Sequence, residues 1–142
     1  MAAQPPTVLL VDDEPSLLVL LQTAMRRAGF AVYVAHNGAE GERQALALLP
    51  DIIVCDIIMP PPDGFELRQM LADNPVTRDI PFVFLTARTD PAARSRARED
   101  RANDFITKPF DRDDLIARLW AVLHRQPQRQ SDQAEGGVAG ER

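Results

Sequence analysis

The sequence has few of the features that mark secreted or membrane proteins. It contains a single cysteine, Cys55, so no disulfide can form within the chain. Its longest apolar runs are far shorter than the roughly 20 residues that a membrane-spanning helix needs. The first residues, MAAQPPT, lack the basic and apolar regions of a signal peptide. These absences predict a soluble cytoplasmic protein without a membrane partner.

Positive charge is scarce, and lysine is almost missing. The 142 residues include 16 Lys and Arg against 21 Asp and Glu, so the net charge is −5. An overall negative field does not favour nonspecific binding to nucleic acid, and we expect no direct nucleic-acid partner. Lys108 is the only lysine beside fifteen arginines. Because lysine carries a compact charge and arginine a planar fork, Lys108 is expected to fill a role that arginine cannot.

Short apolar, β-branched runs alternate along the chain with segments of helical periodicity. Strict alternation predicts a parallel sheet with helices on both faces. Within the second helix, Ala45, Leu48 and Leu49 are expected to face the core. The predicted strands are residues 7–11, 31–35, 52–56, 81–86 and 104–107, and the predicted helices are 15–28, 38–49, 63–72, 91–100 and 111–125.

The length of the chain suits one domain with a full core. We assign that domain to residues 7–125, preceded by a short N-terminal extension, residues 1–6. Residues 126–142 are polar, rich in Gln and Gly, and without periodicity. Such a composition is typical of a disordered tail or of the beginning of a linker.

A carboxylate stands at the end of the third predicted strand, where an apolar run delivers Asp56. Buried there, it costs free energy unless it is paired or bound to a metal. Ligands of open α/β sheets lie beyond the carboxyl ends of the strands, where this chain also places Asp12, Asp13, Thr86 and Lys108. If the first and third strands are neighbours, three carboxylates converge and raise one another's pKa values. A hard cation such as Mg²⁺, which prefers oxygen ligands, relieves that repulsion.

Four motifs carry a resemblance to a known family. They are V-D-D-E (11–14), D-I-I-M-P-P-P-D-G (56–64), L-T-A (85–87) and D-F-I-T-K-P-F (104–110). In this order and with these separations, the chain resembles the receiver domain of two-component response regulators. The resemblance implies a flavodoxin-like fold of the chemotaxis type, with a five-stranded parallel sheet in the order 2-1-3-4-5.

The resemblance also implies a phosphorelay function and a metal site. Asp56 would accept a phosphoryl group from the phosphohistidine of a sensor histidine kinase or a phosphotransfer protein. Mg²⁺, for which Mn²⁺ would substitute, would be held by Asp13, by Asp12 directly or through water, by Asp56, and by the backbone carbonyl of Ile58. Such a protein is a signalling receiver, which catalyses only its own phosphorylation and dephosphorylation.

Further roles follow for residues at the ends of the fourth and fifth strands. Thr86 and Lys108 would contact the phosphoryl group. Phe105 would either turn inward when Thr86 moves or simply pack as an alternating strand residue. Pro109 would follow a cis peptide bond, while Ala87 and Arg88 would modulate the site. The output surface, through which two copies could pair as a homodimer, would be the face formed by helix 91–100, strand 104–107 and the last helix.

The fourth helix departs from the resemblance. Residues 87–100, ARTDPAARSRARED, offer only alanines for burial, and Arg101 stands where receivers commonly have glycine. We therefore expect this helix to be loosely docked, with its arginines forming either a partner-facing surface or a solvated face with internal ion pairs.

Three alternative functions make different demands on the sequence. The chain could be the N-terminal receiver of a longer regulator with a DNA-binding or enzymatic output domain. An aspartyl-nucleophile phosphohydrolase is remote, because such enzymes place a second acid two residues after the nucleophile, where this chain has Ile58. A flavodoxin-like cofactor binder is also remote, because the Asp12-Asp13-Glu14 run would repel a phosphate.

Overall fold

The structure, a computed structural model, describes residues 4–125 of the chain. It has one sheet of five parallel strands in the order β2-β1-β3-β4-β5, and a helix follows each strand, which confirms the predicted fold. The strands are β1 (Thr7–Val11), β2 (Ala31–Ala35), β3 (Ile52–Cys55), β4 (Phe82–Thr86) and β5 (Asp104–Thr107). The helices are α1 (Pro15–Arg27), α2 (Gly38–Leu48), α3 (Gly64–Ala72), α4 (Pro91–Glu99) and α5 (Arg112–Arg125). The segment predicted as a tail, 126–142, lies outside the described residues.

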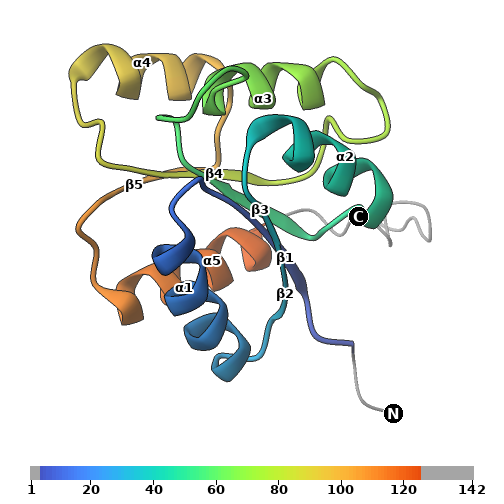
Figure 1. Cartoon of the computed structure of the whole chain (residues 1–142), viewed down its shortest axis with the longest axis vertical. Coiled ribbons are helices and arrows are strands. Elements are labelled where there is room, and N and C mark those ends of the chain that lie inside the picture. The colour runs from blue at the N-terminus through green and yellow to red at the C-terminus, as the bar shows by residue number, and fades with distance from the viewer. Residues whose placement is uncertain (1–3, 126–142) are drawn as a thin grey trace, which may run out of the picture.

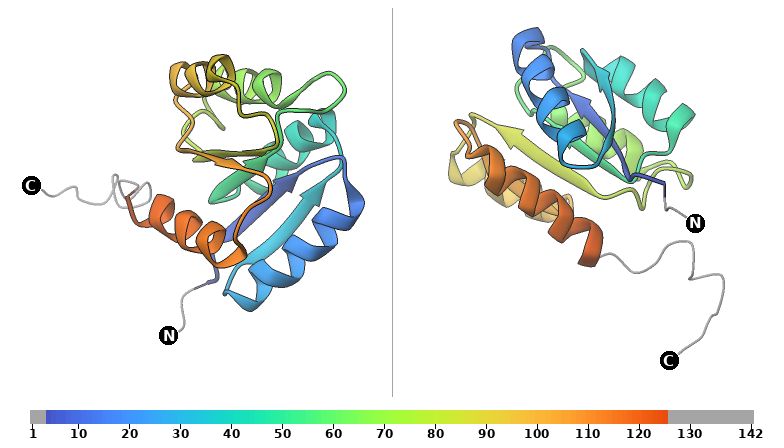
Figure 2. Two further views of the ribbon diagram at one scale, coloured as in Figure 1. Left: turned by 90° about the vertical axis from the view of Figure 1, so that its left-hand side faces the viewer. Right: turned by 90° about the horizontal axis from the view of Figure 1, so that it is seen from below.

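The helices form two layers, one on each face of the sheet. Helices α1 and α5 cover one face, and α2, α3 and α4 cover the other (Figures 1 and 2). Alternate residues of β1 supply the two cores, since Leu9 packs with the α2–α4 side and Leu10 with the α1–α5 side. Within the described residues, no helix is both long enough and apolar enough to cross a membrane.

Side-chain caps start four of the five helices. Asn37 accepts a hydrogen bond from the backbone N–H of Glu40, and Asp63 forms a reciprocal capping box with Glu66. Asp90 caps α4, and Asp111 accepts from the N–H of Asp114 at the start of α5. Because each helix follows a strand, these caps fix the helix N-termini at the carboxyl edge of the sheet, where the candidate site lies.

One predicted core residue is exposed. Leu49, expected to face inward with Ala45, has half of its surface accessible, at 50%. It follows the last residue of α2 and adopts a left-handed conformation with φ 47°. The helix therefore stops one residue earlier than its periodicity suggested, and the side chain of Leu49 turns out of the helical register.

Helix α4 is attached by unusual means. Of its nine residues only two of the three alanines, Ala93 and Ala97, are buried. The guanidinium of Arg96 lies 4.4 Å from the centre of the Phe65 ring on α3. The buried Arg68 of α3 donates from Nε to the carbonyl of Asp100, at the end of α4, over 3.1 Å. Arginine contacts thus replace part of the apolar packing that this helix lacks.

Candidate functional site

Asp12 and Asp56 leave the sheet side by side. Their preceding residues, Val11 and Cys55, are partners in the register of β1 and β3. The backbone N–H of Asp56 donates to the carbonyl of Val11 over 3.0 Å. This bond keeps the two backbone segments together just beyond the ends of β1 and β3. Both residues are buried, with 5% of the surface of Asp12 and 7% of that of Asp56 exposed when backbone and side chain are taken together. The sheet order alone therefore brings together two acids that are far apart in sequence.

A third carboxylate completes a cluster that fits a metal ion. One oxygen each from Asp12, Asp13 and Asp56 can be chosen so that all lie within 4.8 Å of one another. Asp13 is exposed, so the cluster opens to solvent on that side. Hard carboxylate oxygens with room for water are the donor set that Mg²⁺ takes, and Mn²⁺ takes the same oxygens. The residues present therefore fit the expected cation.

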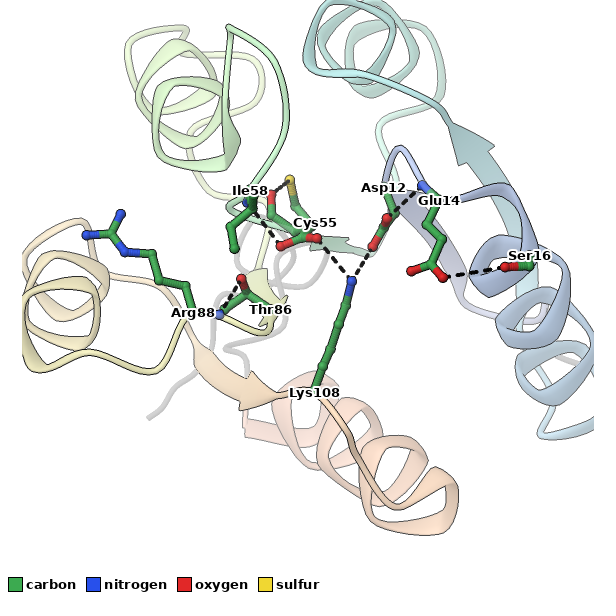
Figure 3. A network of polar contacts seen from close by, with 9 residues as sticks. Asp12, Glu14, Ser16, Cys55, Ile58, Thr86, Arg88 and Lys108 are labelled. Atoms are coloured by element: carbon green, nitrogen blue, oxygen red, sulfur yellow. Dashed lines mark hydrogen bonds and ion pairs between the residues drawn. The ribbon is translucent and has the colours of Figure 1, made fainter.

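Lys108 joins the two buried carboxylates (Figure 3). Its Nζ lies 2.9 Å from Oδ2 of Asp12 and 3.0 Å from Oδ2 of Asp56. The lysine follows β5, two strands away from β3, and its backbone N–H donates to the carbonyl of Thr86 over 2.8 Å. The peptide bond between Lys108 and Pro109 is cis. The long stem of lysine spans the distance from the sheet edge to the carboxylates.

Burial and pairing act in opposite directions on these groups. Burial disfavours the charge on Lys108, but its bonds to Asp12 and Asp56 outweigh this and raise the pKa of the ammonium. Burial raises the pKa of Asp12, and the bonds from Lys108 and from the N–H of Glu14 offset only part of that effect. One ammonium thus does not fully offset the burial of Asp12, and a divalent cation would relieve that remaining cost.

Each carboxylate is also oriented by the backbone. The N–H of Ile58 donates to Oδ1 of Asp56 over 3.1 Å, and the N–H of Glu14 donates to Oδ1 of Asp12 over 2.9 Å. Since Lys108 holds the Oδ2 atoms, both oxygens of each acid are engaged and the planes of the carboxylates are set. The side chain of Ile58 is exposed, at 54%.

The loop after Asp56 is closely packed. A Cβ at Gly64 would lie 2.2 Å from the carbonyl oxygen of Asp56, so only glycine fits there. A Cβ at Gly38, the first residue of α2, would lie 2.3 Å from the carbonyl oxygen of Pro62. Three successive prolines, 60–62, fix φ in this loop. Two glycines and three prolines therefore hold the Asp56 loop against α2 and α3.

Thr86 and Arg88 lie beside the carboxylates at the end of β4 (Figure 3). The Thr86 side chain is fully buried, and its Oγ1 accepts a hydrogen bond from the backbone N–H of Arg88 over 3.1 Å. The guanidinium of Arg88 pairs with Asp90, while Ala87, between Thr86 and Arg88 in the sequence, is exposed. Of the two residues expected to modulate the site, Arg88 therefore has a polar partner that sequence reasoning did not identify.

Phe105 stands apart from the charged cluster, on β5. It is half-buried and packs against the core under α4, with its ring 6.4 Å from that of Phe84. The guanidinium of Arg94 lies 4.7 Å from the centre of the Phe105 ring, on its outer side. This arginine–aromatic contact was also missed, because helical periodicity does not predict which ring an exposed arginine will cover.

Comparison with known proteins identifies the family. Residues 8–120 match the response regulator receiver domain. The chain belongs to this family. It is 36% identical over 120 residues to the DNA-binding dual master transcriptional regulator RpaA of a Synechocystis species, a match that covers 84% of this chain and 50% of the regulator.

Solved receiver structures share the whole fold. Chemotaxis protein CheY4 of Vibrio cholerae superposes with a TM-score of 0.79 at 28% identity, covering 83% of this chain and 98% of that protein. The non-phosphorylated HemR receiver domain of Leptospira biflexa gives a TM-score of 0.79 at 31% identity, covering 86% and 97%. The chain spans about half the length of the curated relatives it matches. The family match therefore describes a receiver domain, and it does not extend to the other half of those longer relatives.

Proposed function

We propose that this receiver is the phosphoacceptor of a two-component phosphorelay and that Asp56 is the residue phosphorylated. The observation that carries the proposal is the placement of its carboxylate between Lys108, the N–H of Ile58 and the two acids Asp12 and Asp13. Phosphoryl transfer needs positioning and charge neutralisation more than covalent assistance, and these neighbours supply both.

The reaction is a displacement at phosphorus. A carboxylate oxygen of Asp56 attacks the phosphoryl group of a phosphohistidine on a sensor kinase or phosphotransfer protein, and the bond from phosphorus to the imidazole nitrogen breaks. Lys108 neutralises a phosphoryl oxygen, and Asp12, Asp13, Asp56 and the carbonyl of Ile58 would hold Mg²⁺. When bound, the cation neutralises charge on the transferring group. Because the phosphohistidine donors are cytoplasmic in this scheme, we expect the receiver to act in the cytoplasm.

The response begins at Thr86. Its hydroxyl accepts the N–H of Arg88, and the proposed switch turns it to donate to a phosphoryl oxygen. Phe105 lies one strand away, at a half-buried position that it can leave for a more buried one. Such a movement changes the face formed by α4, β5 and α5, which we propose as the surface for an output partner or for a second copy of the chain.

Intact-mass measurement tests this function. The protein is incubated with Mg²⁺ and acetyl phosphate, and the same reaction is run with a chelator and with the Asp56→Asn variant. We expect one added phosphoryl group in the wild type with Mg²⁺ and none in either control. An adduct of the same yield in Asp56→Asn would refute the assignment of Asp56.

A second arrangement, in which this receiver is one domain of a longer regulator, is supported by the relatives. The match to RpaA, whose name describes DNA binding, covers 50% of that protein. In that arrangement the switch would act on an output domain of the same polypeptide. Immunoblotting of the source cells distinguishes the two arrangements, because a lone receiver migrates near 15.8 kDa and a two-domain regulator at about twice that mass.

A further inference from the structure

Arg88 is held by a two-point ion pair beside the proposed phosphorylation site. Its Nε lies 2.8 Å from Oδ1 of Asp90, and its terminal NH2 nitrogen lies 3.2 Å from Oδ2 of the same carboxylate. Both side chains are exposed, at 39% and 43%. Water screens a pair that is this accessible, so even with two-point geometry it is open to competition from an anion of higher charge.

The backbone of Arg88 is anchored to the residue proposed to touch the phosphoryl group. Its backbone N–H donates to Oγ1 of Thr86, so the side chain of Arg88 starts from a backbone position directly beside the site. In Figure 3 its side chain extends away from Lys108 and the carboxylates. The guanidinium lies 5.8 Å from the centre of the Phe65 ring, between the starts of α3 and α4. Arg88 therefore stands at the border of the site but is turned toward Asp90.

Asp90 has a second function that does not depend on Arg88. Its Oδ2 accepts the N–H of Ala93 over 3.2 Å and caps helix α4. When Arg88 departs, that cap stays in place and continues to satisfy the first turn of the helix. The ion pair can therefore open without unfolding α4. Its opening leaves the guanidinium of Arg88 free to bind another anion, while Asp90 keeps its bond to the helix N-terminus.

We propose that Arg88 is a phosphoryl-binding residue that Asp90 holds away from the site until Asp56 is phosphorylated. This inference rests on the proposed function of Asp56. A phosphoryl group carries close to two negative charges and three acceptor oxygens, so it attracts a planar guanidinium more strongly than a single exposed carboxylate does. The exchange of partners links occupation of the site to the segment that begins α4.

Binding of a phosphoryl mimic measures the competition at equilibrium. The affinity for beryllium fluoride in the presence of Mg²⁺ is measured by calorimetry for wild type, Asp90→Asn, Arg88→Ala and the double variant. Asparagine keeps the helix cap and removes the charge that holds Arg88. We expect Asp90→Asn to bind the mimic about two- to fivefold more tightly, which is the range of equilibrium constants of exposed ion pairs. Arg88→Ala should bind it about threefold or more weakly.

The double variant tests whether Asp90→Asn acts by releasing Arg88 or merely by removing one negative charge near the site. In the Arg88→Ala background, Asp90→Asn should have no effect, because the residue that it releases is gone. Asp114→Asn is the matched control, since Asp114 is an exposed aspartate that pairs with Arg118 on α5, and its removal should leave the affinity unchanged. An Asp90→Asn effect that persists without Arg88, or no effect at all, overturns the proposal. Failure of the wild type to bind beryllium fluoride would instead overturn the proposed function.

Discussion

At the scale of single residues, the site depends on one lysine between two buried acids. Lys108 reaches Asp12 and Asp56 from a different strand, with distances of 2.9 and 3.0 Å. The side chains involved are 17%, 7% and 8% exposed, so water screens the interaction only slightly. Removing the ammonium would leave buried acids without their cationic partner, so we expect Lys108 to stabilise the fold in addition to the phosphoryl-binding role proposed for it.

We predict that Lys108→Ala lowers the free energy of unfolding by about 2–3 kcal/mol without metal, somewhat less than for a fully buried pair. Mg²⁺ should restore more stability to this variant than to the wild type, because the cation then neutralises carboxylates that have no other partner. Urea unfolding with and without Mg²⁺ measures both effects. The control is Arg118→Ala, which breaks exposed pairs with Asp104 and Asp114 and should cost less than about 1 kcal/mol. Equal losses in the two variants would contradict this account.

The residues of the site differ in how far sequence could predict them. Lys108 was marked by the scarcity of lysine, and Asp56 by a carboxylate at the end of an apolar run. The partners of Arg88 and Phe105 were not predictable, because exposed arginines satisfy their donors with whichever acid or ring the loop geometry brings near. The motifs predicted that the charged residues Asp56 and Lys108 converge. The contacts of Arg88 with Asp90 and of Phe105 with Arg94, at the edge of the site, became known only from the structure.

At the scale of elements, α2 begins with a reciprocal set of bonds that depends on pH. The carboxylate of Glu40 accepts the backbone N–H of His36, while Asn37 accepts the N–H of Glu40 over 2.8 Å. The bond from the His36 N–H is the largest cause of a pKa of Glu40 below its ordinary value. A carboxyl group with a lowered folded-state pKa contributes stability above its unfolded pKa and loses that contribution as the pH falls through the folded value.

We therefore predict that Glu40→Gln destabilises the protein at pH 7 by about half a kcal/mol, as expected for an accessible charge-assisted contact. The difference between variant and wild type should be smaller at about pH 3 than at pH 7, because the pH then falls toward the lowered folded-state pKa of Glu40 and protonation removes the charge. Chemical unfolding at the two pH values measures it. A difference that stays the same at both values would show that the charge of Glu40 has no part in stability.

Helix α4 is the element with the least apolar support. It buries Ala93 and Ala97, whereas α1 buries Leu18, Leu21 and Met25. A stack on Phe65 and a bond from Arg68 are the contacts that compensate. The stack contributes about 0.5–1 kcal/mol at an accessible position, and a hydrogen bond from a charged group about 1.5–3 kcal/mol. The sequence predicted this helix as residues 91–100, one residue longer than the structure has it, but its manner of attachment was not predictable.

We predict that the backbone amides of α4 exchange with deuterium faster than those of α1, since fewer apolar contacts oppose local opening. Arg96→Ala should accelerate exchange in α4 further, because it removes the stack on Phe65 and the pair with Asp100. Hydrogen-exchange mass spectrometry resolves the two helices, with α1 as the internal control. Equally slow exchange in α1 and α4 would show that the arginine contacts fasten α4 fully.

At the scale of the whole molecule, the fold was predictable because the apolar runs, the helical periodicity and the capping residues all indicate the same alternation of strands and helices. Apolar runs of strand length alternate with capped helices, and a doubly wound arrangement buries both faces of such strands. The order of the strands came from the resemblance, and the register between β1 and β3 then places Asp12 beside Asp56. The left-handed residue at Leu49 escaped prediction, because periodicity does not show where a helix ends without glycine.

We propose that Asp56 carries the phosphoryl group, and chemical reduction of the phosphorylated protein identifies the residue that carries this group. After reaction with acetyl phosphate and Mg²⁺, borohydride converts an aspartyl phosphate to homoserine at the position that carried it. Peptide sequencing by tandem mass spectrometry should find homoserine at position 56, and none when Mg²⁺ is withheld. Homoserine at position 12 or 13, or a phosphoryl group that survives on a serine or threonine, would contradict the account.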